Sequence, residues 1–133
     1  MNKNTIYLCG PINGRSDEDA KNWREHVKAR WLGFCLDPMR RDYRGQESGN
    51  DSEIVRADLE DIDLCNGLVV YFDKPSVGTS MEVFYAKYVK NKPVVVINAS
   101  GKPLSPWLIH HSDHQSEHIS SALAMLDMLI RGR

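Results

Sequence analysis

Strand-like apolar runs alternate with amphipathic helical patterns along this chain, and that order narrows the possible folds more than any other feature. The predicted strands cover Thr5–Cys9, Phe34–Asp37, Gly67–Phe72 and Pro93–Ile97. The predicted helices cover Asp17–Leu32, Ser52–Cys65, Thr79–Lys90 and Ile119–Ile130. Because a βαβα order places successive strands in parallel, we expect a three-layer α/β fold with a mostly parallel sheet of four to five strands flanked by helices. We expect a single domain over residues 1–133.

Composition limits the partners that the chain can bind. The formal net charge is −1 and most basic residues are dispersed, so nucleic-acid binding has little electrostatic support. We find no stretch apolar enough to span a membrane and no signal-peptide core, so we expect a cytoplasmic protein without membrane contact. Cys9, Cys35 and Cys65 have no metal-like spacing, and we expect buried, reduced thiols without a chemical role.

Two polar segments, Pro38–Asn50 and Ala99–Glu117, are longer than most connections and are candidate binding loops. The histidines between His110 and His118 have no cysteine or carboxylate signature that would complete a zinc site, so they predict a polar loop or a subunit contact. We therefore expect neither a metal nor a cofactor.

Two carboxylates fall on helix faces that should be buried. Glu82 shares the predicted inward face of its helix with Met81, Tyr85, Ala86 and Val89, while Val83 should face away. Asp58 lies within the stripe formed by Ile54, Val55, Leu59, Ile62 and Cys65. A charge on an inward face needs a structural or a chemical reason.

The surroundings of the two carboxylates predict different protonation. Desolvation favours the neutral form of Asp58, whereas the first turn of a helix favours the charged form of Glu82. Such a pair suits glycosidic bond cleavage, with Glu82 as nucleophile and Asp58 as proton donor. Two structural alternatives remain open: Thr79-x-x-Glu82 also fits a capping box, and Asp58 could pair with an arginine such as Arg24 or Arg56.

The run Ile6–Pro11, Asp58 in the second helix and Gly78-Thr79-x-Met81-Glu82 together resemble the nucleoside 2-deoxyribosyltransferase superfamily. The resemblance spans most of the chain. It implies a flavodoxin-like, Rossmann-related fold and cleavage of the N-glycosidic bond of 2′-deoxynucleosides or their 5′-monophosphates. It also implies that Glu82 is the nucleophile, that Asp58 is the general acid or positions the base, and that Tyr7 contacts the nucleophile.

The resemblance further bears on the substrate. The superfamily's transferases usually carry an acidic residue six positions before the nucleophile, whereas its monophosphate N-glycosidases carry a phosphate-binding serine there, and this chain has Ser76. Ser105 resembles a second phosphate-binding serine, contributed across a dimer interface, which implies a homodimer or a higher homo-oligomer. The remaining expected substrate contacts are Gly10, Pro11, Ile12, Asn13, Gly78 and Trp107.

Some positions depart from the hydrolase pattern. Asn13 and Arg15 stand where those hydrolases often have a serine or an arginine, and could replace that contact. Arg40, Arg41 and Arg44 are another candidate anion contact, or a solvated loop. Trp107 is a candidate to stack on the base, or to pack against a helix.

The sequence thus favours hydrolysis of a nucleoside 5′-monophosphate to a free base and a sugar phosphate. Two alternatives stay open: a base-exchanging transferase and a nucleotide sensor without turnover.

Overall fold

The computed structural model describes residues 4–133 and contains one parallel sheet with the strand order β2-β1-β3-β4-β5. This is the strand order of flavodoxin-like folds, so the predicted fold class is confirmed. The strands are β1 (Thr5–Cys9), β2 (Phe34–Leu36), β3 (Gly67–Phe72), β4 (Val94–Asn98) and β5 (His114–Ser116).

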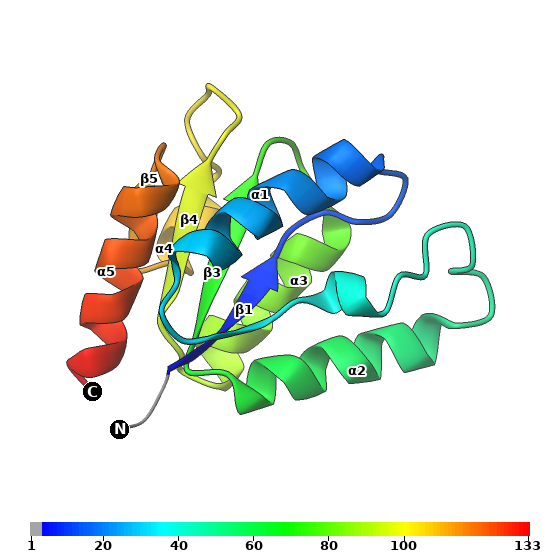
Figure 1. Cartoon of the computed structure of the whole chain (residues 1–133), viewed down its shortest axis with the longest axis horizontal. Helices are drawn as coiled ribbons and strands as arrows, with labels where there is room; N and C mark the ends of the chain where they lie inside the picture. Colours follow the sequence, from blue (N-terminus) through cyan, green and yellow to red (C-terminus); the bar gives the residue numbers. More distant parts are fainter. Residues whose placement is uncertain (1–3) are drawn as a thin grey trace.

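Helices cover both faces of this sheet (Figure 1). Their bounds are α1 (Asp17–Arg30), α2 (Asp51–Leu64), α3 (Val77–Phe84), α4 (Pro106–His110) and α5 (Ile119–Arg131). A 3-10 turn, η1 (Pro38–Arg40), follows β2, and a π-helical segment, η2 (Tyr85–Val89), continues α3. None of the helices in the described range 4–133 is both long and apolar enough to cross a bilayer.

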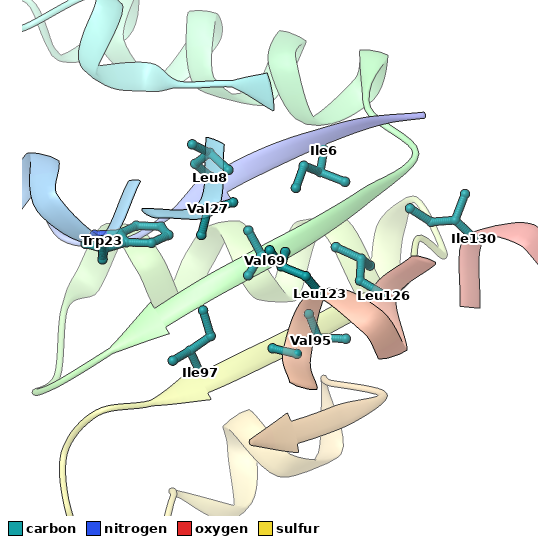
Figure 2. Close-up of a cluster of buried hydrophobic side chains, with 11 residues drawn as sticks. Ile6, Leu8, Trp23, Val27, Val69, Val95, Ile97, Leu123, Leu126 and Ile130 are labelled. Atoms are coloured by element: carbon teal, nitrogen blue, oxygen red, sulfur yellow. The ribbon is translucent and has the colours of Figure 1, made fainter. Parts of the chain in front are cut away.

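Side chains that alternate along β1 divide the core into two clusters. Ile6 and Leu8 point to the α1 and α5 side, where they pack with residues such as Val69 and Leu126 (Figure 2). The side chains of Tyr7 and Cys9 belong to the opposite cluster, under α2 and α3. Because strand residues alternate with a period of two, two polar-tipped side chains of one buried strand face the same pair of helices.

The segment Ala99–Glu117, which was expected to be a loop, contains α4 and β5. β5 has the sequence His-Gln-Ser and pairs with β4 at the sheet edge, with His114 opposite Val95. A three-residue polar strand carries no apolar pattern, so sequence periodicity does not reveal it.

The predicted inward face of the third helix was partly wrong. Val83 is buried and Met81 is 68% exposed, the reverse of the expectation, because the buried side of this helix follows Thr79, Val83 and Ala86. The helix begins at Val77, two residues before its predicted start, and it widens into η2 after Phe84. A π-helical turn adds a residue per turn and rotates only the side chains that follow, which include the exposed Val89.

The second helix also differs from its predicted face. Val55 is 56% exposed although it was assigned to the apolar stripe, whereas Ile62 is fully buried. Asp61 is buried, which the stripe did not indicate, because two arginines reach it. Ion pairing, and not apolar spacing alone, therefore determines which residues of this helix are buried.

Candidate active site

The candidate site lies at the carboxyl ends of β1 and β3, where the strand order reverses direction. In open α/β sheets this switch point is the usual position of a ligand crevice. The loop that begins at Gly10 follows β1, and Ser76 follows β3 as the N-cap of α3.

A cavity of about 170 Å³ occupies this position. It brings together nine of the eleven predicted site residues: Tyr7, Gly10, Pro11, Ile12, Asn13, Asp58, Ser76, Gly78 and Glu82. Whole small-molecule sites usually span about 300 to 1,000 Å³, so this cavity is large enough for only part of a typical small-molecule ligand.

Both carboxylate oxygens of Glu82 accept hydrogen bonds from β1. The Tyr7 hydroxyl donates to Oε2 at 3.1 Å, and the Cys9 thiol donates to Oε1 at 3.3 Å. Tyr7 and Cys9 lie two residues apart on one face of the strand, so a single strand fixes both oxygens. The predicted contact between Tyr7 and Glu82 is present.

Glu82 and Asp58 line the same cavity, and each influences the pKa of the other. Burial raises the pKa of Glu82 to about 8, and the negative charge of Asp58 adds to this shift. Burial also raises the pKa of Asp58, while hydrogen bonds from Glu82 and Arg41 oppose that shift. Two like charges in one desolvated site do not ionise together, so the pair retains a proton at neutral pH.

The predicted reason for a charged Glu82 was wrong. Ser76 caps α3 by accepting a hydrogen bond from the Thr79 backbone N–H at 3.5 Å, and the helix begins at Val77. Glu82 therefore lies in the second turn, beyond the free N–H groups that would favour its ionised form. For the same reason the capping box with Thr79 is wrong, since Glu82 bonds to Tyr7 and Cys9 instead.

Asp58 has an arginine partner, but not one of the expected two. Arg41 donates to Asp58 at 3.1 Å and to the buried Asp61 at 2.8 Å. Arg24, one of the arginines expected to pair with Asp58, instead pairs with Asp37 at 3.4 Å. Arg41, which also lines the cavity, thus links Asp58 to the buried Asp61.

The other arginines near the cavity also have carboxylate partners. Arg40 pairs with Asp61, and Arg44 pairs with Asp42 and Asp17. Arg15 forms a bidentate pair with Asp73, at 2.7 and 3.0 Å. These guanidinium groups are therefore ion-paired rather than free, although Arg41 and Arg44 do line the cavity.

Close packing fixes the loop after β1. A Cβ atom at Gly10 would lie 2.6 Å from Cζ2 of Trp23, so glycine is required there. The buried guanidinium of Arg24 donates to the Gly10 carbonyl at 3.0 Å and stacks on Trp23 at 4.6 Å from the ring centroid. These contacts hold the loop that forms one wall of the cavity.

Ser105 and Trp107 do not line this cavity. Ser105 is the N-cap of α4 and accepts from the Trp107 backbone N–H at 3.2 Å. The indole of Trp107 is exposed and stacks against His111, with ring centroids 6.0 Å apart. Within one chain, these two predicted site residues therefore lie at α4, outside the cavity that contains Glu82.

Sequence reasoning missed several residues of the site. Cys9 was expected to have no chemical role, yet it bonds to Glu82. Tyr43 and Glu47 reach the cavity from the candidate binding loop 38–50, but no spacing rule identifies contacts made by an irregular loop. Cys9 and Cys65 are buried free thiols as expected, whereas Cys35 is only half-buried. Among residues 4–133, no three His, Cys, Asp or Glu side chains gather as metal ligands.

Comparison with known proteins agrees with this architecture. The family model described as nucleoside 2-deoxyribosyltransferase matches residues 6–126. A similar solved structure is a 2-deoxyribosyltransferase from the psychrotolerant bacterium Bacillus psychrosaccharolyticus. It has a TM-score of 0.75 and 18% sequence identity, and the match covers 92% of this chain and 95% of that one. No curated protein matches the chain significantly.

The carboxyl pair gives a direct prediction for titration. In protein labelled with ¹³C at glutamate carboxyl groups, one resonance should titrate near pH 8, and Glu82→Gln should remove it. Asp58→Asn should lower the pKa of Glu82, because it removes a neighbouring negative charge. A set of resonances that all titrate near the ordinary value of about 4.3 would contradict the buried pair.

Proposed function

The chain belongs to the nucleoside 2-deoxyribosyltransferase family, and we propose that it cleaves the N-glycosidic bond of a 2′-deoxynucleoside or its 5′-monophosphate through a covalent intermediate on Glu82. One observation carries the proposal. Glu82 lines the cavity at the switch point, with both oxygens held by β1 and with Asp58 in the lining of the same cavity. A carboxylate held in this way is positioned to attack a sugar carbon bound in the cavity.

The reaction needs the proton of the pair on Asp58. Glu82, in its ionised form, attacks C1′ of the sugar as the bond from C1′ to the base nitrogen breaks. The electron pair of that bond goes to the base, which takes the proton from Asp58. An acceptor then attacks C1′, Asp58 removes its proton, and the ester to Glu82 breaks to regenerate the carboxylate.

The finer proposal is that the substrate carries a 5′-phosphate and that water is the acceptor. Ser76 supports it, because a hydroxyl and the N-terminus of α3 favour an anion where a carboxylate would repel it. Thr79, which lines the same cavity, has a buried hydroxyl without a hydrogen-bond partner among the described residues. These two hydroxyls and the backbone N–H groups between them would bind the phosphate.

Base exchange is a second candidate, and the family match favours it. A second base would intercept the same ester on Glu82, so both outcomes share the first step. A closed, water-poor cavity favours exchange over hydrolysis.

Release of free base, followed by chromatography, tests the common step. We expect release from 2′-deoxynucleosides or their 5′-monophosphates, and a loss of about 10³-fold or more in Glu82→Gln because the nucleophile is gone. Glu60→Gln, which changes an exposed glutamate of α2 outside the cavity, should retain most of the activity. Mass spectrometry of quenched reactions should find a sugar adduct on Glu82. Full turnover by Glu82→Gln would refute the mechanism, and tight binding without any release would indicate a sensor.

The phosphate proposal predicts a change in substrate preference. Ser76→Asp should lower kcat/KM for monophosphates about tenfold or more, and should affect nucleosides much less, because a carboxylate repels the phosphate. Ser80→Asp adds the same charge at an exposed position of α3 and is the matched control. Equal losses on nucleosides and monophosphates would contradict a phosphate contact at Ser76. A second base added in parallel shows whether water or a base accepts the sugar.

We also propose that the chain forms a homodimer through the outer face of α3, η2 and α4. Large apolar side chains are exposed there: Val77, Met81, Phe84, Tyr88 and Trp107. Phe84 and Tyr88 stack with ring centroids 5.1 Å apart, beside a groove of about 390 Å³ that Trp107 also lines. A contiguous apolar face of this kind is typical of a protein interface, and Ser105, as the N-cap of α4, lies next to it.

Light scattering tests this interface. The parent should behave as a dimer or a higher oligomer, and Phe84→Arg should shift it towards the monomer because a charge would be buried at the contact. Met128→Arg, at an exposed apolar position on α5, is the control and should leave the assembly unchanged. A monomeric parent at micromolar concentration would contradict the proposal.

A further inference from the structure

We infer that Cys9 is a positioning residue for Glu82, whose thiol holds the non-attacking oxygen of the carboxylate and favours its ionised form. This inference rests on the proposed cleavage through Glu82. It assigns a function to a buried thiol that the reaction itself does not consume.

The hydrogen bond of the thiol is directed at Glu82. Cys9 is fully buried, and its Sγ lies 3.3 Å from Oε1 of Glu82 and 3.9 Å from the Thr79 carbonyl oxygen. The shorter contact is to the carboxyl group of Glu82, and this bond becomes stronger when Glu82 ionises. The thiol proton therefore goes mainly to Glu82.

The two donors of β1 hold different oxygens. Both residues are fully buried in the core cluster under α2 and α3, but Tyr7, which binds Oε2, also lines the cavity, whereas Cys9, which binds Oε1, does not. Oε2 is thus the oxygen on the substrate side and would form the bond to C1′. Oε1 becomes the carbonyl oxygen of the ester and keeps Cys9 as its neighbour throughout.

Burial and the neighbouring charges keep Cys9 a thiol rather than a thiolate. Burial raises the pKa of Cys9 well above its ordinary value, and the charge of Glu82 raises it further, while Arg24 opposes the shift. Asp58 also acts on Cys9, and Tyr7 is a further titratable group, hydrogen-bonded to Glu82. Cys9 therefore remains a proton donor over the whole range in which Glu82 titrates.

Removing this donor should act through the ionisation of Glu82. The Cys9 hydrogen bond lowers the pKa of Glu82, so Cys9→Ala should raise that pKa by about half a unit to one unit. At neutral pH a smaller fraction of Glu82 is then ionised, and kcat/KM should fall about three- to tenfold. The loss should shrink as the pH rises past the titration of Glu82, because the carboxylate is then ionised in both proteins.

Cys65→Ala is the matched control. Cys65 is a buried thiol of the same core cluster, but it donates to the Ile62 carbonyl oxygen and does not bond to Glu82. Any effect of Cys65→Ala on kcat/KM should be independent of pH. Cys9→Ser, which keeps a donor, should return the pH profile to that of the parent or move it to lower pH. A loss in Cys9→Ala that is equal at every pH, or a Cys9→Ser profile that follows Cys9→Ala, would overturn the inference.

Titration of the ¹³C-labelled carboxyl of Glu82 separates this inference from the proposed function. It reports the pKa without turnover, so it can be read even if the parent cleaves none of the tested substrates. We expect a higher pKa in Cys9→Ala and the parent value in Cys65→Ala. An unchanged pKa in Cys9→Ala would refute the role of Cys9, whatever the reaction proves to be.

Discussion

The site depends on the burial of a carboxylate against a parallel sheet. An acid that is removed from water needs hydrogen bonds or a proton, and Glu82 has both. β1 supplies Tyr7 and Cys9 as donors, and the charge of Asp58 helps to keep the proton on Glu82. The strand can provide two donors because its side chains alternate, so Ile6 and Leu8 fill one core cluster while Tyr7 and Cys9 enter the other. A single strand therefore stabilises the fold and positions the reactive group.

Protonation of the carboxyl pair is the opposite of what its proposed chemistry requires. The proton resides mainly on Glu82 in the free site, because burial and the charge of Asp58 raise the pKa of Glu82. Arg41, fixed by the buried Asp61, stabilises the ionised form of Asp58 and so supports this arrangement. The proposed cleavage uses the other tautomer, with the proton on Asp58. Transfer of one proton within the pair connects the resting form to the reactive form.

Much of the fold could be predicted from the sequence pattern, whereas the contact between Tyr7 and Glu82 was implied only by the resemblance to a known family. Apolar strands with helices between them determine a parallel sheet, and its switch point then locates the cavity. The start of α3 at Val77 could not be predicted, because Ser76 and Thr79 are both good caps and the choice depends on tertiary contacts. The arginine partners of Asp58 and Asp61 were also hidden. These arginines lie in and after η1, an irregular segment without a periodic pattern. Ion pairs between residues far apart in the sequence follow no fixed spacing, so they cannot be read from it.

Each arginine beside the cavity forms an ion pair with at least one aspartate. Arg40 and Arg41 pair with Asp61, Arg41 also reaches Asp58, and Arg44 binds Asp42 and Asp17. Opposite charges in contact cancel at a distance, so this rim produces little long-range field. A charged ligand would therefore approach by ordinary diffusion, without electrostatic steering, and its rate of binding would depend little on salt concentration. The protein would distinguish its ligands only after they reach the cavity, where hydroxyl and backbone groups act over the length of a hydrogen bond.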